Sequence, residues 1–388
     1  MSQRLKVVGL FAGIGGIEAG LARANHHSIM LNEIDPTARR VLAAHFAGIP
    51  LTGDIRNLKQ LPPADLVAAG FPCTDISQAG RKTGIAGSES SLVDEIFRLI
   101  SAARTRPNWL FLENVSYMLR LDHGKAMQHI IDAAEGLGYR WAYRVIDCRA
   151  FGLPQRRQRV AFLASLDDDP RRVLFADDAN DLHYDDLIGE IHPDSAYGFY
   201  WTEGLRGLGW TKDAVPTIKG GSGLGIPSAP AIWFPDAGEV GTPQIEDAER
   251  MQGFPPDWTL PSVIPGERRG RRWKQVGNAV CVPMSEWVGH RLANPGKIVE
   301  GSWDVPLNTQ RWPIAAWGGR GEAWLAPVTM SPRQEAFDIR KFLNLPIKPL
   351  SAKATAGFLD RAYRGKLRFS EGFLESLTCH LSLMRSLS

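Results

Sequence analysis

Short apolar runs alternate with longer helical patterns along the first 164 residues of this 388-residue chain. Two of the runs, 66–69 and 109–112, are continuous, which is typical of central strands buried on both faces of a sheet. Helices are predicted at 17–24 and 36–46, and the Asp-Pro pair before the second suits an N-cap and a first turn. Further strands are predicted at 6–10, 28–32 and 159–164. The alternation as a whole indicates a parallel α/β sheet.

The pattern changes after about residue 165. Residues 195–245 are rich in Gly, Pro and Trp and have short β-like runs without a helical period, which predicts a small irregular, mainly β region. Helical character returns near Ile245, and two more helices are predicted at 351–363 and 370–383. The predicted organisation is an α/β domain with a mainly β insertion and a C-terminal helical extension, divided as 1–164, 165–245, 246–295 and 296–388.

Composition and charge exclude some classes of protein. Hydrophobic residues make up 44% of the chain and charged residues 22%, without an apolar run that could cross a bilayer or a signal-peptide layout. We therefore expect a cytoplasmic protein with no membrane partner. The net charge of +3 does not by itself predict a nucleic-acid partner, but residues 267–274 (ERRGRRWK) carry five bases.

The four cysteines are widely separated and form no CxxC pair, so neither a metal cluster nor a disulfide framework is predicted. We expect Cys148, Cys281 and Cys379 to be small buried hydrophobes, as most cysteines of reduced proteins are. Cys73 differs because it follows a predicted central strand, at the sheet edge where open α/β folds bind ligands. Its polar, turn-rich surroundings make it a candidate nucleophile, which needs a lowered pKa or a nearby base.

A glycine-rich turn follows the first predicted strand. Gly13, Gly15 and Gly16 let a ligand approach the backbone beside a helix N-terminus. Glu33 ends the next strand, where an acid suits ribose hydroxyls. The spacing is GxGG rather than GxGxxG, and Asp54 ends a further segment, which together favour an adenosyl ligand over a dinucleotide. The alternatives are an ordinary strand–helix turn and a capping role for Asp54.

Two further stretches place charged groups near the same predicted edge. Glu113 follows the strand at 109–112, with a surface carboxylate or cap as the alternative. Gln155, Arg157 and Arg159 alternate along one predicted strand, which puts all three on one face; a solvated strand edge is the alternative. A thiolate, an acid and two guanidiniums beside an adenosyl site suit the addition of a nucleophile to an electron-poor ring.

With these motifs the sequence resembles the DNA (cytosine-5) methyltransferase family. Eight blocks appear in the family's order within roughly residues 5–290, namely FAGIGG, NEID, GDI, GFPC, ENV, QRRQR, RMQGFPPDW and QVGNAV. The resemblance implies a Rossmann-like, S-adenosylmethionine-dependent methyltransferase domain, with target recognition at 165–245. It also implies double-stranded DNA as partner and a place in a bacterial-type cytosol with the nucleoid; a partner restriction endonuclease is left open.

The resemblance assigns roles to individual residues. Chemistry on a stacked base requires flipping of the cytosine. Cys73 would then attack carbon 6, with Glu113 hydrogen-bonded to ring nitrogen 3. Arg159 would hold the base's carbonyl oxygen and Arg157 would brace the pocket. The implied cofactor shell is Phe11, Gly13, Gly15, Glu33, Ile34, Asp54 and Asn278. The substrate-binding residues that it implies are Pro72 and Gln155. The charge of the basic run, and not the resemblance, predicts phosphate contacts for Arg268, Arg269, Arg271, Arg272 and Lys274, with a solvated charged face as the alternative.

Two departures from the family pattern limit what the resemblance implies. Thr74 stands where the family often has Gln after the Pro-Cys pair. The residues after 296 lie beyond the shared blocks, which leaves DNA binding, self-association and packing on the core as roles for them. Methylation of transfer RNA is an alternative function, against which the long 165–245 region argues. A catalytically silent DNA-binding module is another, against which the intact Cys73, Glu113 and paired arginines argue.

Overall fold

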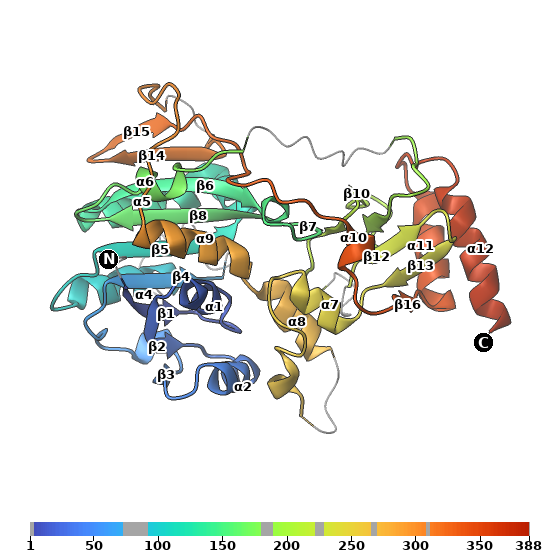
Figure 1. Ribbon diagram of the computed structural model, residues 1–388, viewed down its shortest axis with the longest axis horizontal. Helices are drawn as coiled ribbons and strands as arrows, with labels where there is room; N and C mark the ends of the chain where they lie inside the picture. The colour runs from blue at the N-terminus through green and yellow to red at the C-terminus, as the bar shows by residue number, and fades with distance from the viewer. Residues whose placement is uncertain are drawn as a thin grey trace, which may run out of the picture. The chain divides into compact units, whose positions relative to one another are not determined.

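The computed structural model describes residues 4–72, 92–179, 189–221, 229–264, 270–307 and 311–387. The chain forms two compact units, each assembled from separate stretches (Figure 1). Unit 1 comprises Met1–Ala150, Gln158–Asp181 and Val280–Gln334. Unit 2 comprises Phe151–Arg157, Leu182–Ala279 and Glu335–Ser388. The C-terminal stretch, expected from the sequence as one extension, is therefore divided between the two units.

Unit 1 is built around a nine-stranded sheet of order β15-β14-β6-β8-β5-β4-β1-β2-β3. Its first five strands are parallel: β1 (Lys6–Leu10), β2 (His27–Asn32), β3 (Leu51–Thr52), β4 (Leu66–Gly70) and β5 (Trp109–Val115). The predicted strands are all present, yet the expectation of a parallel sheet is wrong for the other half. β8 (Gln158–Ser165) lies between β5 and β6 (Arg140–Asp147) and runs antiparallel to both. The connection from β6 to β8 contains no α-helix, whereas a parallel pair needs a long crossover.

Helices cover both faces of this sheet. Val8 and Leu10 of β1 belong to the same core cluster as side chains of α4 and α5. Gly9, between them, faces the opposite way towards α1, because a Cβ at Gly9 would lie 2.2 Å from Oε1 of Glu18. The Asp-Pro start of α2 is confirmed, with the Asp35 side chain accepting the N–H groups of Thr37 and Ala38. The helices of unit 1 are α1 (Gly16–Arg23), α2 (Pro36–His45), α4 (Leu92–Ala102), α5 (Lys125–Gly136), α6 (Arg171–Leu174) and α9 (Val282–Ala293).

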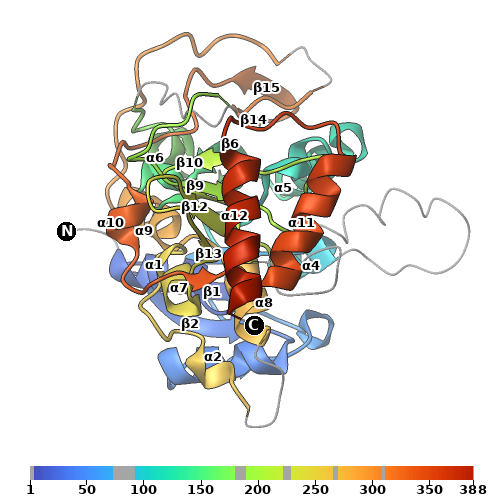
Figure 2. The same ribbon diagram turned by 90° about the vertical axis from the view of Figure 1, so that its right-hand side faces the viewer.

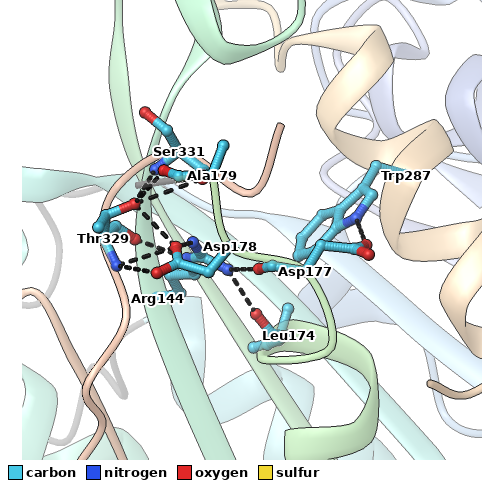
Figure 3. A network of polar contacts seen from close by, with 8 residues as sticks. All are labelled: Arg144, Leu174, Asp177, Asp178, Ala179, Trp287, Thr329 and Ser331. Carbon is cyan, nitrogen blue, oxygen red and sulfur yellow. Dashed lines mark hydrogen bonds and ion pairs between the residues drawn. The ribbon is translucent and has the colours of Figure 1, made fainter. Parts of the chain in front are cut away.

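The first part of the C-terminal stretch completes the sheet of unit 1. β14 (Ala315–Gly319) pairs with β6, and β15 (Glu322–Leu325) pairs with β14. Arg144 of β6 is fully buried and binds the neighbouring segments (Figure 3): Nε donates to the carbonyl oxygen of Thr329 at 2.7 Å, and the guanidinium is ion-paired with Asp178. Burial lowers the pKa of Arg144 to about 10, so the group stays charged at neutral pH.

Unit 2 contains a five-stranded antiparallel sheet of order β10-β9-β12-β13-β16. A smaller parallel sheet joins β7 (Gln155–Arg156) to β11 (Val215–Pro216). These short strands confirm the mainly β character predicted for 195–245. The strands of the larger sheet are β9 (Tyr197–Phe199), β10 (Thr211–Lys212), β12 (Ala231–Phe234), β13 (Glu239–Thr242) and β16 (Lys348–Pro349).

The last two helices lie side by side and complete the core of unit 2 (Figure 2). Phe358 of α11 (Ala352–Arg364) and Phe373 of α12 (Phe373–Ser386) pack into one aromatic cluster with Phe199 and Trp233 of the sheet. Both helices were predicted, although α12 begins three residues later than expected. The remaining helices of unit 2 are α7 (Ile245–Arg250), α8 (Arg271–Asn278) and α10 (Ile339–Phe342).

Candidate active site

The glycine turn joins β1 to α1 with a backbone that favours glycine. Phe11, Gly13 and Gly15 have φ values of 53°, 58° and 86°. A Cβ at Gly13 would meet no atom of the described residues within 4 Å, so this glycine leaves open space beside the turn. A Cβ at Gly16, in contrast, would lie 2.5 Å from the carbonyl oxygen of Val280. The positive φ of Phe11 is a strained conformation of the kind found at ligand sites.

Glu33 is held against this turn by backbone hydrogen bonds. Its Oε2 accepts the N–H of Gly13 at 2.7 Å, and its Oε1 accepts the N–H of Asp35 at 2.7 Å. A carboxylate has about four lone-pair sites, so both oxygens can also accept hydroxyl groups. Ile34, the next residue, is 61% exposed. An open turn, a fixed carboxylate and an exposed apolar side chain fit an adenosyl ligand.

Asp54 and Asn278, the other polar members of the expected cofactor shell, have less specific surroundings. Asp54 caps the 3-10 turn η1 (Ile55–Asn57): its Oδ1 accepts the N–H of Arg56 at 3.0 Å, and the guanidinium of Arg56 is ion-paired with the carboxylate. This is the capping role left open by the sequence, and the Arg56 side chain lowers the pKa of Asp54. Asn278 ends α8 with an exposed side chain. Cofactor contacts by both residues stay predictions.

Glu113 and Arg159 form an ion pair on neighbouring antiparallel strands. The register of β5 and β8 places Val115 opposite Arg159, so Glu113 and Arg159 share one face of the sheet. Nε of Arg159 lies 3.0 Å from Oε1 of Glu113, and the two side chains are 10% and 8% exposed. The pair lies near the carboxyl end of β5, at the edge where the sequence predicts the reaction.

Asn114 connects this strand to the chain that leads to Cys73. Its Nδ2 donates to the carbonyl oxygen of Phe71 at 3.0 Å, and its Oδ1 accepts the N–H of Val115 at 2.8 Å. Pro72 follows as an exposed residue, and Cys73 itself lies outside the described residues. Sequence reasoning read the ENV block only as a base contact and missed this anchor. The signal available in the sequence was the side-chain amide of Asn114 directly after Glu113, the candidate catalytic acid.

Gln155, Arg157 and Arg159 do not lie on one strand, contrary to the expectation from their alternation. β7 ends at Arg156 and β8 begins at Gln158, because the two segments pair with different sheets. Gln155 is buried in unit 2, where its Nε2 donates to the carbonyl oxygen of Met251 at 2.9 Å. The buried guanidinium of Arg157 donates to three backbone carbonyls of unit 2, those of Ile218, Gly277 and Ala279.

The basic cluster is only partly described. Arg268 and Arg269 lie outside the described residues, while Arg271 and Lys274 have exposed side chains in α8. Arg272 has a terminal nitrogen 3.0 Å from carboxylate oxygens of both Glu249 and Asp257. Because these carboxylates already neutralise Arg272, the expected phosphate contact does not fit this residue.

The other cysteines differ in exposure. Cys148 and Cys281 are buried as expected, whereas Cys379 is exposed on α12. The expectation for Cys379 is wrong because the buried side of α12 is formed by Phe373, Leu377 and His380. Within the described part of the chain, no group of three or more His, Cys, Asp or Glu residues is arranged to hold a metal ion. None of the described helices is both long and apolar enough to cross a membrane.

Comparisons with known proteins decide the family. The model of the C-5 cytosine-specific DNA methylase family matches residues 5–195. The type II methyltransferase M2.BsuMI of Bacillus subtilis is 49% identical over 380 residues, which cover 96% of this chain and 97% of that protein. The chain belongs to the C-5 cytosine-specific DNA methylase family. This family uses S-adenosylmethionine as methyl donor.

Methyltransferases with lower sequence identity also match this chain. The type II methyltransferase M.NlaX of Neisseria lactamica is 28% identical over 315 residues, covering 74% of this chain and 96% of that protein. Two solved structures show the same fold. The methyltransferase EhMeth of Entamoeba histolytica matches with a TM-score of 0.51 and 14% identity, over 75% of this chain and 98% of its own. The Dnmt2 methyltransferase of S. pombe matches with a TM-score of 0.54 and 17% identity, over 74% and 98%.

Proposed function

We propose that this family member methylates carbon 5 of a cytosine flipped out of duplex DNA, through a covalent bond to Cys73. The buried Glu113–Arg159 pair carries the proposal, because it sets an acid and a guanidinium together at the carboxyl edge of the sheet. The same unit contains the glycine turn and Glu33. An acid and a cation held side by side match the hydrogen-bonding edge of cytosine, which presents ring nitrogen 3 beside a carbonyl oxygen.

The reaction begins with addition of the Cys73 thiolate to carbon 6. The sulfur–carbon bond takes its electron pair from the thiolate, and the ring π electrons move to make carbon 5 nucleophilic. Glu113, once it has taken up a proton from solvent, donates a hydrogen bond to ring nitrogen 3 and transfers that proton to it; the proton returns to Glu113 when the ring is restored. Arg159 holds the carbonyl oxygen and stabilises the charge that collects there. After carbon 5 is methylated, its proton leaves to a base, the electron pair restores the double bond, and the Cys73 thiolate departs.

The cofactor site in this proposal is the glycine turn. S-adenosylmethionine supplies an electrophilic methyl group when bound. Glu33 would accept hydrogen bonds from the ribose hydroxyls, Ile34 would pack against the adenine ring, and the open backbone at Gly13 would accommodate the amino-acid end. Asp54 would accept a hydrogen bond from the adenine amino group while it remains paired with Arg56. The contact between Asn278 and the cofactor, which the family resemblance implies, stays a prediction.

Unit 2 is the reader of DNA sequence in this proposal. Residues 195–245 contain loops and short strands rich in Gly and Trp, which suit a groove-reading surface. Arg271 and Lys274, which are exposed on α8, contact phosphates in this proposal. Arg157 and Gln155 are positioning residues in this proposal, because their side chains donate hydrogen bonds to backbone carbonyls of unit 2. We infer that the enzyme acts on DNA in a bacterial cytosol; a partner restriction endonuclease stays a prediction, supported by the type II names of the relatives.

A mechanism-based trap tests the proposal. DNA with 5-fluorocytosine at the target position should form an adduct with Cys73 that survives denaturing electrophoresis and requires S-adenosylmethionine. Fluorine cannot leave as a cation, so the last elimination is blocked. Cys73→Ala should abolish the adduct and methylation while still binding DNA. Cys148→Ala, Cys281→Ala and Cys379→Ala are matched controls that should each trap normally.

Two outcomes would contradict the proposal. An active wild type that never traps on a verified target would exclude the covalent mechanism. Trapping by Cys73→Ala as efficient as wild type would place the nucleophile elsewhere. Competition between duplex DNA and transfer RNA as methyl acceptors tests the substrate, and we expect methyl transfer to DNA alone.

A further inference from the structure

The end of α11 and the loop 201–207 form one continuous surface of unit 2. Nε of Arg361 donates to the carbonyl oxygen of Glu203 at 3.0 Å, and a terminal nitrogen donates to that of Trp201 at 2.7 Å. A Cβ at Gly365 would lie 2.7 Å from the carbonyl oxygen of Gly204. The loop and the helix end are therefore packed backbone against backbone, although about 160 residues separate them in sequence.

This surface, which we call the α11 surface, is basic with apolar groups among the charges. Residues 361–368 (RAYRGKLR) contain four basic residues and no acid. Tyr363 is 65% exposed and Leu205 is 48% exposed. The α11 surface consists of these two side chains and the exposed cations Arg206, Arg364, Lys366 and Arg368.

The cations of the α11 surface differ in their partners. Arg364 is ion-paired with Asp360, four residues earlier on the helix. For Arg206, Lys366 and Arg368, the described residues provide neither a side-chain hydrogen bond nor an ion pair. Three unneutralised charges and an exposed aromatic ring are thus presented on a backbone that the Arg361 hydrogen bonds hold in place.

We propose that the α11 surface binds the DNA backbone outside the target base, with Arg206, Lys366 and Arg368 on phosphates and Tyr363 against a sugar. This rests on DNA being the substrate of the enzyme. Phosphates supply the complementary charge, and release of their counterions drives such binding. A second copy of the chain fits this surface poorly, because a two-fold contact would bring the same cations face to face.

The test uses the full chain and a random-sequence 40-base-pair duplex, with affinity measured by fluorescence anisotropy between about 50 and 300 mM salt. The triple variant Arg206→Ala, Lys366→Ala, Arg368→Ala should lower the slope of log affinity against log salt by about 2–3 units. A matched control removes three exposed bases of unit 1, Lys59→Ala, Arg104→Ala and Lys297→Ala, and should lower the slope by less than about one unit. The charge-keeping triple Arg206→Lys, Lys366→Arg, Arg368→Lys should behave as wild type.

Each result decides the proposal. A loss confined to the α11 triple, with an unchanged melting temperature, supports it. Equal losses in the two triples would mean a general effect of net charge and would overturn it. So would an unchanged slope combined with dissociation of a wild-type dimer in sedimentation, which would make this face a self-association surface. Trapping at Cys73 by the α11 triple under saturating DNA separates failure of this surface from failure of the proposed catalysis.

Discussion

Arg159 lies 3.0 Å from Glu113, and this pair joins two antiparallel strands near the edge of the sheet. The pairing holds the acid in one orientation before any base arrives. Glu113→Gln should slow methyl transfer about 10²–10⁴-fold, the range for loss of a general acid. Arg159→Ala should cause a similar loss, and the double variant should lose much less than the product of the two, because both act on one ring.

Single-turnover methylation rates measure this coupling. The matched control is the Arg98–Glu95 pair of α4, where Arg98→Ala and Glu95→Gln should leave the rates unchanged. Independent, multiplicative losses for Glu113 and Arg159 would argue against a shared role at the base.

Glu33 and Asp54 should contribute differently to the affinity for S-adenosylmethionine, because their hydrogen bonds differ. Glu33→Gln keeps the shape but replaces one acceptor oxygen by an NH₂ group facing a backbone N–H, so it should weaken S-adenosylmethionine binding strongly. Asp54→Ala should weaken it about ten- to hundredfold, the effect of one charge-assisted hydrogen bond. Calorimetry measures both. Arg56→Ala keeps the backbone N–H that Asp54 caps and removes only the ion pair. If it weakens binding as much as Asp54→Ala does, the ion pair with Arg56 and not a contact with the cofactor explains the effect of Asp54.

The buried acid Glu18 predicts an unusual dependence of stability on pH. Its carboxyl group is 1% exposed, and burial, with the nearby Glu33 charge, raises its pKa to about 8. The folded state therefore keeps a proton that the unfolded state has released, so stability falls as pH rises from about 4.5 towards about 8. Glu18→Gln, which mimics the protonated form, should gain on the order of 3 kcal/mol over wild type at pH 7 and almost nothing at pH 4.5. Denaturant titrations at the two pH values measure this, and an equal effect at both would refute the assignment.

Neighbouring arginines of α8 should behave differently. Arg272 is ion-paired with the fully buried Glu249, so Arg272→Ala should cost about 3–5 kcal/mol of stability. Arg271→Ala should leave stability nearly unchanged and lower the salt slope of DNA binding by about one unit. Melting and anisotropy measurements on the same two variants test whether Arg272 contributes to stability and Arg271 to DNA binding. A salt-slope loss in Arg272→Ala with normal stability would reverse it.

The strands, the first helices and the glycine turn could be predicted because local pattern determines them. The Asp35 cap and the apolar runs at β4 and β5 are visible within a few residues of sequence. Strand direction could not be predicted, because β8 is inserted between β5 and β6 by a connection whose course depends on pairing elsewhere. The alternation through Gln155, Arg157 and Arg159 misled for the same reason: the chain leaves one sheet and enters another between the first and the last of them.

Side-chain partners were the least predictable part of the site. The basic run containing Arg272 looks uniform in sequence, yet in the structure Arg272 is ion-paired with the distant Glu249 and Asp257. The anchoring bond from Asn114 to Phe71 likewise joins residues 43 positions apart. Such long-range polar contacts leave no periodic signal for a sequence pattern to report.

The chain passes from one unit to the other after residues 150, 157, 181, 279 and 334. Unit 2 is therefore encoded by separate segments of the gene and not by one contiguous segment. β16 pairs with β13 and Phe373 packs on Trp233, so the segment after 334 supplies part of the interior shared with 182–279. A recombination event that exchanged only the central segment between two such genes would join mismatched halves of one core. If unit 2 reads the DNA sequence as proposed, transfer of its specificity to another methylase would require both segments to be exchanged together.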